Sequence, residues 1–483
     1  MPTTDLSKTS ERSILNRFAQ LVSAQMIEAL ANTGFILYLA WLSSSLYGEV
    51  MYAIAGGAVV FKVVQFGLYY PLVAALGRES DSAKPEILNQ VNIIKIVLFA
   101  LTISFLLGFG LYKKFSAEMT LILIFVCLGF ALDAFTETFF ADLRVRGRQD
   151  QEARVRIAGS LLGYGFGFAA GAAGFHPIVV SLFAFVSAAV KLGIAAVLYK
   201  RAYSAALVMR PDWSAVWLMF RSSVTFALIE ILGVFYNKTN VFFLESVVGV
   251  KGVAYYSSTW NIVDTSSTLV SEQLLGWVIF PLLASIWWNN RDRAARLIHD
   301  NAKWLMILAL PIMFLLHVES ELLIGLIYPA EYADAVWMQK FLVWTILLSF
   351  ENNLFFYVMM VAGGANVLLL FTVAVALLNL ALNLALVGPL GLMGGCLVII
   401  LTKLVMALLT FLYCQVRFRF FSFGDAVFPI ILATVSLGLF VVCKLIIGLH
   451  PAVAVTIVFY FLALWRVGER FLGPLSARGS GEA

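Results

Sequence analysis

Apolar runs of about 20 residues recur along the whole 483-residue chain, with few charges inside them and polar clusters between them. A run of this length is what an α-helix needs to cross the hydrocarbon core of a bilayer. Hydrophobic residues make up 61% of the chain and charged residues 13%, whereas soluble domains are typically about half apolar and a quarter charged. The sequence therefore predicts an all-α membrane protein that crosses the bilayer many times.

The apolar windows predict fourteen transmembrane helices, which places both ends of the chain on one side of the membrane. They lie at about 14–43, 48–77, 86–111, 117–142, 155–173, 177–199, 214–245, 250–286, 301–327, 334–361, 365–387, 390–415, 425–446 and 450–467. Only short connections remain between them, and no nucleotide-binding motif is present. We therefore expect neither an enzyme nor an ATP-driven pump, and no cofactor.

Basic residues are distributed unequally between the two sides of the membrane. If the N-terminus is cytoplasmic, 22 of the 33 Lys and Arg residues fall at the cytoplasmic ends of the predicted helices, and only Lys113, Lys114 and Lys251 fall in external loops. This asymmetry is typical of membrane proteins oriented by their positive charges, so we expect both termini in the cytoplasm. Within this set, we interpret Arg144, Arg146 and Arg148 as charges near anionic lipid headgroups, with contact to a pyrophosphate at the inner gate as the alternative.

The chain repeats itself weakly at an offset of 204 residues. Arg17 and Arg221 open the first and seventh predicted helices, and Gly48 and Gly252 open the second and eighth. Two parallel sets of six helices are typical of a transporter with its site between the halves. The predicted organisation is an N-lobe at 1–204, a C-lobe at 205–420 and two additional C-terminal helices at 421–483.

Polar residues inside transmembrane helices are costly and are therefore candidates for a functional site. In the helix predicted at 250–286, Ser257, Asn261, Asp264, Thr268 and Ser271 follow one another at spacings of 4, 3, 4 and 3, which places them on one face. Such a face lines a wet cavity or seals against another polar helix.

Three more predicted helices carry polar faces, and by the repeat these four helices form two equivalent pairs. Their polar residues are Gln25, Glu28 and Asn32; Lys62, Gln65 and Tyr69; and Glu230, Asn237 and Lys238. We infer that the four helices surround a central, water-filled cavity of mixed charge. In the structural alternative, Glu28 or Glu230 pairs with Lys62 or Lys238 and holds the helices together.

A second pair of acids lies in the helix predicted at 117–142. Asp133 and Glu137 are four residues apart and so share a face, which could form a cation or proton site or pair with Lys95 or Lys191. The four histidines are scattered along the chain, and no metal site is predicted.

Three segments of the chain resemble a known group of transporters. Two of them are similar to helical hairpins of polysaccharide and lipid-linked oligosaccharide flippases: NLALNLALVGPLGLMGGC (379–396) and NKTNVFFLESVVGVKGVAYYSSTW (237–260). The third, LYGEVMYAI (46–54), is similar to the turn between the first and second helices of these flippases. These flippases belong to the multidrug/oligosaccharidyl-lipid/polysaccharide superfamily, and with fourteen spans the resemblance covers nearly the whole chain.

The resemblance implies two lobes that open alternately to each side of a bacterial cytoplasmic membrane. The implied cargo is a lipid-linked oligosaccharide or an exopolysaccharide precursor, and the implied partners are membrane lipids and polysaccharide polymerase and export machinery, with no nucleic acid. The candidate substrate-binding residues are Arg17, Lys62, Gln65, Tyr69, Arg221, Asn237, Lys238, Tyr256, Trp260, Asn261 and Asp264. The candidate residues for coupling to Na⁺ or H⁺ are Glu28, Asp133, Glu137 and Glu230.

Two alternative functions follow from the same residues. The acids of the predicted cavity at least match its bases, which departs from a clearly cationic flippase cavity and is compatible with a cation-coupled multidrug antiporter of the same superfamily. A membrane polysaccharide polymerase is the third reading. It is disfavoured because the short external connections contain no arginine.

Overall fold

The structure is a computed structural model that describes residues 4–203, 212–268, 275, 279–288, 290–419 and 423–472. Side chains are described over the same ranges except at 4–19, 281, 423–426 and 467–472. Two compact units divide the chain, Met1–Ala254 (unit 1) and Tyr255–Ala483 (unit 2). The lobe boundaries predicted after residues 204 and 420 both fall in segments outside the described residues.

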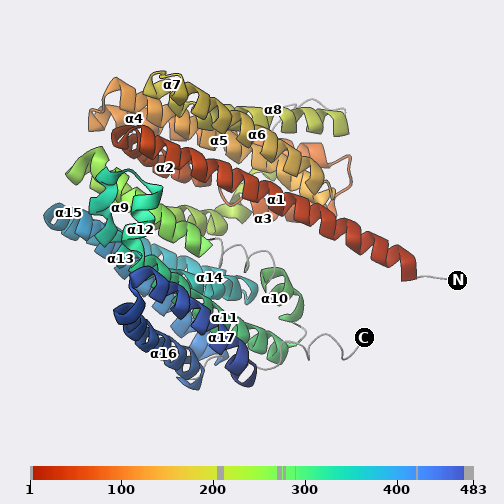
Figure 1. Ribbon diagram of the computed structural model, residues 1–483. Helices are drawn as coiled ribbons and strands as arrows, with labels where there is room; N and C mark the ends of the chain where they lie inside the picture. Colours follow the sequence, from red (N-terminus) through yellow and green to blue (C-terminus); the bar gives the residue numbers. More distant parts are fainter. Residues whose placement is uncertain are drawn as a thin grey trace. The chain divides into compact units, whose positions relative to one another are not determined.

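Helices account for nearly all of unit 1, and Figure 1 shows them running side by side. They are α1 (Thr4–Leu42), α2 (Ser44–Gln65), α3 (Tyr69–Arg78), α4 (Lys84–Lys113), α5 (Ala117–Val145), α6 (Gln149–Ala172), α7 (Pro177–Ser181), α8 (Phe183–Tyr203) and the first part of α9 (Trp213–Ser267). The most extensive packing joins α2 to α5, α1 to α6, and α8 to both α5 and α6.

Unit 2 contains the end of α9 and the remaining helices. These are α10 (Phe280–Ile286), α11 (Arg291–Val318), α12 (Ser320–Ile327), the 3₁₀ helix η3 (Ala330–Ala335), α13 (Val336–Leu342), α14 (Thr345–Val361), α15 (Ala365–Phe418), α16 (Phe423–Ile447) and α17 (Leu449–Leu472). The last two helices form a pair that packs on α11, where the Tyr460 hydroxyl donates to the Ile307 carbonyl at 2.9 Å.

Among the described helices, the two longest each contain a kink at a glycine. In α9, Gly249 has φ 71° and ψ −178°, and in α15, Gly391 has φ 54° and ψ −125°. A side chain disfavours positive φ, so glycine is the residue that allows the backbone to leave the helical conformation there. The sequence predicted breaks between 245 and 250 and between 387 and 390. The structure has the first at Gly249, within the predicted gap, and the second at Gly391, one residue beyond it.

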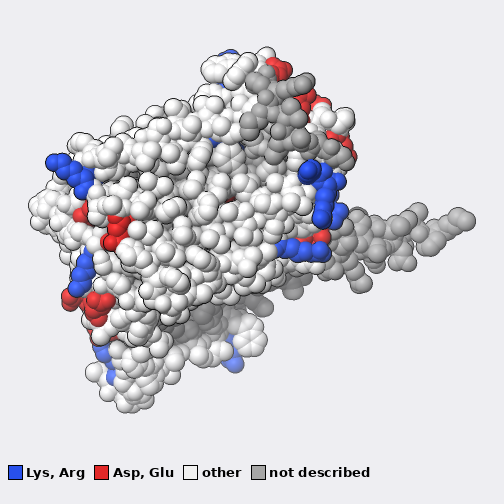
Figure 2. All heavy atoms as spheres, turned by 90° about the horizontal axis from the view of Figure 1, so that it is seen from above, with Lys and Arg blue, Asp and Glu red and all other residues white. Residues whose placement is uncertain are grey.

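The predicted number of membrane spans agrees with the helices observed. Within the described residues, nine helices are long and apolar enough to cross a membrane, and a tenth span results if the bent pair Ala330–Leu342 and Thr345–Val361 is one unit. Counting both halves of α9 and α15, and adding the long but more polar α1 and α6, gives the fourteen predicted segments. Figure 2 shows a face whose Lys, Arg, Asp and Glu gather mainly at two edges, with a largely uncharged surface between them.

The helix predicted over 48–77 is interrupted. Phe66 and Gly67 have φ of 47° and 59°, so α2 ends at Gln65 and α3 begins at Tyr69. A Cβ at Gly67 would lie 2.5 Å from the Ala227 nitrogen, which shows how closely this break approaches α9. The three residues predicted to share a face are therefore divided between two helices, with Lys62 and Gln65 on α2 and Tyr69 as the first residue of α3.

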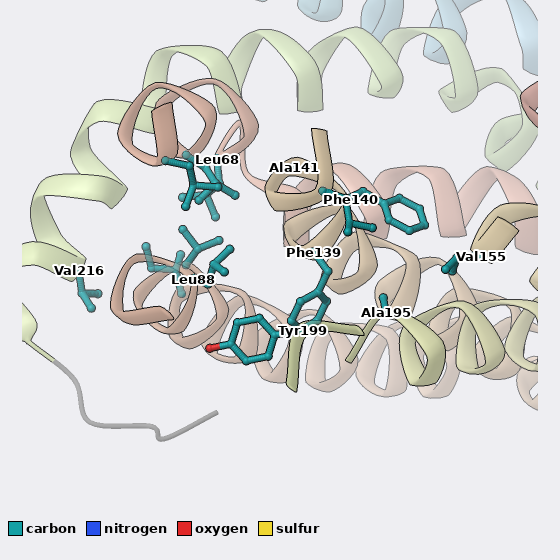
Figure 3. Close-up of a cluster of buried hydrophobic side chains, with 14 residues drawn as sticks. Leu68, Leu88, Phe139, Phe140, Ala141, Val155, Ala195, Tyr199 and Val216 are labelled. Carbon is teal, nitrogen blue, oxygen red and sulfur yellow. The ribbon is translucent and has the colours of Figure 1, made fainter. Parts of the chain in front are cut away.

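Next to this break, an apolar cluster contains buried side chains from six segments of unit 1. Figure 3 shows Leu68 near Leu88 and Phe139 near Tyr199, with Val155 farther along the cluster. Burial of such side chains contributes roughly 1.5–3 kcal/mol for each large residue in water, and inside a bilayer the contribution comes mainly from close packing.

Gly129 offers a test of the packing between α5 and α8. A Cβ there would lie 2.6 Å from the Ala184 carbonyl carbon and 2.9 Å from the Phe185 nitrogen, both backbone atoms that cannot move aside. We expect Gly129→Val to force the helices apart at a cost of about 1–3 kcal/mol. Gly193→Val on α8, where nothing lies within 4 Å, is the matched control. Thermal unfolding of the purified proteins in detergent checks this, and equal melting temperatures for both variants would contradict it.

Candidate functional site

Seven charged side chains from four helices of unit 1 meet in a connected group, which we call the ion cluster. Its members are Glu28 from α1; Asp133, Glu137 and Arg144 from α5; Glu152 and Arg156 from α6; and Lys191 from α8. Asp133 and Glu137 are one turn apart, as are Glu152 and Arg156, so each pair occupies a single helix face. These faces meet because α1 packs on α6 and α8 packs on both α5 and α6.

Arg156 lies at the centre of the ion cluster. Its Nη1 contacts Glu28 Oε2 at 3.1 Å, its Nη2 contacts Glu137 Oε1 at 2.6 Å, and its Nε contacts Glu152 Oε1 at 3.0 Å. Phe140 covers the guanidinium, with the ring centre 4.6 Å away. Only a guanidinium has enough donors in a fixed plane to bind three carboxylates at once.

Arg144, near the end of α5, contacts two of the same acids. Its Nε donates to Glu152 Oε2 at 2.8 Å, and its Nη2 contacts Glu152 Oε1 at 2.5 Å and Glu137 Oε2 at 3.3 Å. The guanidinium also lies 5.5 Å from the centre of the Tyr69 ring. The interpretation of Arg144 as a headgroup charge is wrong, because its contacts are inside the protein.

Arg146 is likewise engaged within unit 1. Its Nη2 lies 2.6 Å from Oδ2 of the buried Asp142, and its guanidinium stacks over Tyr203, whose hydroxyl donates to the other carboxylate oxygen at 2.6 Å. The prediction that Arg146 faces lipid headgroups is therefore also wrong.

Lys191 connects the cluster to its most exposed acid. Its Nζ lies 3.2 Å from Glu28 Oε1 and 2.7 Å from Asp133 Oδ1, and its side chain is 6% exposed whereas that of Asp133 is 32% exposed. Of the two roles predicted for Asp133, pairing with Lys191 is the one the structure contains. Buried charges left without a partner are strongly destabilising, so each member of the cluster requires the others.

Lys95 of α4 lies beside the ion cluster and is fully buried. Its Nζ donates to Gln65 Oε1 at 2.6 Å, to the Ala134 carbonyl at 2.5 Å and to Thr138 Oγ1 at 2.8 Å. All three acceptors are neutral, and no carboxylate of the described residues lies within 4.0 Å. Gln65, a predicted substrate-binding residue, is thus 6% exposed and occupied by Lys95.

Two ion pairs join α9 to other helices of unit 1. Lys62 of α2 lies 3.2 Å from Glu230, and Lys113 of α4 lies 3.3 Å from Glu245. Both pairs are partly exposed, at 30% and 19% for the first and 25% and 17% for the second. The structural alternative predicted for Glu230 and Lys62 is therefore present, and their partial exposure also leaves them accessible to a ligand.

The other candidates in unit 1 remain separate from the ion cluster. Asn237 donates to the Gly233 carbonyl of its own helix at 2.8 Å. Arg221 is exposed and Lys238 is half-buried, and neither has a carboxylate of the described residues within ion-pair distance. The side chain of Arg17 lies outside the described residues.

In unit 2, the predicted aromatic residues pack against each other. The rings of Tyr256 and Trp260 are stacked, with centres 6.3 Å apart, and they are 1% and 4% exposed. Lys403 of α15 lies over Trp260 at 4.8 Å and donates to Ser349 at 2.6 Å. Asn261 and Asp264 are half-buried farther along the same helix, whereas Ser271 of the predicted polar face lies outside the described residues.

Sequence reasoning missed Glu152 and Arg156 as site residues. Both are close to the predicted cytoplasmic loop, where charges ordinarily meet water, and their i,i+4 spacing was the only signal of an ion pair. Lys95 and Lys191 were recognised as possible partners of acids, but the lack of a carboxylate beside Lys95 was not expected. Among the described residues, no three His, Cys, Asp or Glu side chains are grouped so that they could hold a metal ion.

Comparison with known families decides where this chain belongs. The polysaccharide biosynthesis protein family matches residues 42–337, which is more than half of the chain. The chain belongs to this family. The matched segment of this polysaccharide biosynthesis protein includes every member of the ion cluster except Glu28. A search of curated protein sequences found no match.

Solved structures identify the fold of this family member. It matches a structure titled "Lipid II flippase MurJ, inward closed conformation" with a TM-score of 0.68, at 12% identity over 93% of this chain and 98% of the other. An inward-facing multidrug resistance MATE family transporter matches with a TM-score of 0.65, at 15% identity over 83% and 98% of the two chains.

A third match is a transporter from Pyrococcus furiosus, with a TM-score of 0.60, at 16% identity over 84% of this chain and 95% of the other. This transporter and the MATE family transporter are both members of the MOP superfamily. The fold is therefore that of the MOP superfamily, as the sequence resemblance implied.

Proposed function

We propose that this protein is a flippase that moves a lipid-linked oligosaccharide or exopolysaccharide precursor across a bacterial cytoplasmic membrane. The observation that carries the proposal is the membership of the polysaccharide biosynthesis protein family combined with a MOP transporter fold. Sugar hydroxyls and phosphates need polar partners that lipid does not supply, so their passage requires a protein that offers such partners within the membrane.

Transport proceeds by alternating access of two lobes, 1–204 and 205–420, with 421–483 as an added helix pair. Both termini face the cytoplasm, which is supported by the position of 22 of 33 basic residues. Membrane lipids surround the protein, and polysaccharide polymerase and export machinery are its partners.

The cargo phosphate binds to basic side chains that are not fully enclosed. Lys62 and Lys238, with Arg221 and Arg17, are the proposed contacts, because each offers donors to phosphate oxygens. Asn237, Asn261, Asp264 and Tyr69 complete the polar lining. Tyr256 and Trp260 bind sugar rings only after a rearrangement within unit 2 that exposes them, since they are buried in the described structure.

An ion gradient or the membrane potential drives the cycle through the acids at 28, 133, 137 and 230. In the described structure each of these carboxylates already has a Lys or Arg partner. A coupling Na⁺ or H⁺ must therefore compete for each carboxylate with the Lys or Arg side chain already paired with it.

A cation-coupled multidrug antiporter is the second candidate. The observation in its favour is the match to a multidrug resistance MATE family transporter, which is nearly as good as the match to the flippase. Against it, the partnered carboxylates of unit 1 leave little uncompensated negative charge for a cationic drug.

Lipid analysis distinguishes the two candidates. In a strain lacking this protein, we expect lipid-linked oligosaccharide to accumulate in the cytoplasmic leaflet, and the wild-type chain to reverse the accumulation. Mass spectrometry of the extracted lipid identifies the glycan. Unchanged lipids together with raised sensitivity to cationic dyes would refute the flippase and favour the antiporter.

A further inference from the structure

Lys95 is the charged residue of unit 1 whose environment differs most from an ordinary ion pair. It is 0% exposed, yet its ammonium contacts only neutral oxygens. It lies eleven residues into α4, roughly 16 Å along the helix axis, and therefore deep in the predicted span. Burying a charge without a counter-charge is costly, so a lysine in such a place exchanges its proton more readily than one paired with a carboxylate.

The described conformation nevertheless suits the charged form. An ammonium has three donors, and Lys95 has three acceptors at 2.5–2.8 Å, so every proton is bonded. The neighbouring ion cluster contains four carboxylates and three cations. With Lys95 protonated, these eight groups are electrically neutral together.

One of the three acceptors belongs to a break in the fold. Gln65 is the last residue of α2, and the chain then turns through Phe66 and Gly67 into α3. Ala134 and Thr138, by contrast, lie in the middle of the continuous helix α5. A movement at the α2–α3 break therefore withdraws the Gln65 oxygen, while the other two acceptors stay with α5.

We propose that Lys95 is a proton-binding site whose occupancy is linked to the position of the α2–α3 break. The conformation described here, with Gln65 in place, binds the proton more tightly. A conformation with Gln65 withdrawn leaves one N–H of a buried ammonium without a partner, so it binds the proton more weakly. By linkage, raising the pH then favours the second conformation.

Several charged groups on the helices packed against α4 already have partners, whereas the half-buried Glu49 of α2 has no Lys or Arg of the described residues within ion-pair distance. On α2, Lys62 pairs with Glu230; on α5, Glu137 is held by both Arg144 and Arg156 and Asp133 by Lys191. On α3, Tyr69 lies under Arg144, and Arg78 is exposed at the helix end. The proposal rests on the proposed transport function for its role in energy coupling, since a proton bound here would drive the lobe movement.

The test measures conformation without any substrate. Spin labels are placed at the exposed positions Glu79→Cys and Lys200→Cys, both in unit 1, after the four natural cysteines are changed to alanine. Pulsed electron–electron resonance in lipid nanodiscs then gives the distance populations from pH 5 to pH 9. Because one proton is exchanged, the ratio of the two populations should change by up to about tenfold per pH unit near its midpoint.

Lys95→Met should remove this pH dependence, leaving less than a twofold change, because methionine fills the same space without a titrating group. The matched variant Lys113→Met makes the same substitution at the far end of α4, outside the ion cluster, and should retain the wild-type dependence. If the dependence persists in Lys95→Met, disappears in Lys113→Met, or is absent from wild type, the proposal is refuted.

A second variant keeps the test decisive if Lys95→Met fails to fold. Gln65→Glu gives the ammonium a carboxylate partner and should move the midpoint to higher pH by one unit or more. An unchanged midpoint would overturn the proposal. Because no substrate is present, a negative lipid analysis refutes the flippase without affecting this result.

Discussion

Lys62→Ala is expected to abolish export of the glycan precursor while leaving folded protein in the membrane. The lysine is 30% exposed and paired with Glu230, so its removal costs only about 0–1 kcal/mol of stability. Alanine, however, cannot bind phosphate in its place, which is the proposed role of this lysine. Complementation of a deletion strain, scored by surface polysaccharide and by accumulated lipid-linked precursor, measures the effect.

The chain provides a closely matched control for this change. Lys113→Ala removes the other ion pair to α9, which has a similar length and exposure but lies at the far end of α4. We expect it to support normal export. If both alanine variants export equally, Lys62 does not contact the cargo; if both fail, the ion pairs to α9 are needed for structure.

Asp264→Ala extends the same test to unit 2. Asp264 is half-buried, and no cationic side chain of the described residues lies within ion-pair distance. Its loss should therefore disturb the fold little while removing a polar group of the proposed lining. Normal export by this variant would remove Asp264 from the site.

Arg156→Met is expected to destabilise unit 1 more than any other single change considered. It leaves Glu28, Glu137 and Glu152 without a central cation, and breaking a buried ion pair typically costs about 3–5 kcal/mol. We expect little folded protein in detergent extracts, measured by size-exclusion chromatography and by the temperature of unfolding. Arg156→Lys keeps the charge but lacks the three-way fork, so it should recover only part of the loss.

The matched control is Arg154→Met on the same helix. The side chain of Arg154 is 80% exposed, and its ion-pair partner among the described residues is Asp150, at 3.6 Å, so its removal should change stability by less than about 1 kcal/mol. Equal stability of Arg154→Met and Arg156→Met would mean that the ion cluster does not hold the four helices together. A fall in export with normal stability for Arg156→Met would instead place this residue in transport.

Part of the candidate site could be predicted from the sequence. The helical spacing of Asp133 and Glu137 placed them on one face, and Lys191 was among the partners considered for them. The sequence could not distinguish a site open to an ion from a closed ion pair, because that depends on which helices pack together. Arg156 and Glu28 are 128 residues apart, and only the packing of α1 on α6 brings them to 3.1 Å.

Hydrophobic run length, charge asymmetry and the glycine positions were determined by the sequence itself. Each of these is a local property: a helix long enough to span lipid, a basic end and a turn at Gly249 or Gly391 need no distant partner. The tertiary structure alone decided the break after Gln65. The continuous apolar pattern predicted one helix, but the structure has two, α2 and α3, and Gly67 between them lies close to α9. The tertiary structure also decided the neutral environment of Lys95, because the oxygens that surround an ammonium come from helices that meet only in the folded chain.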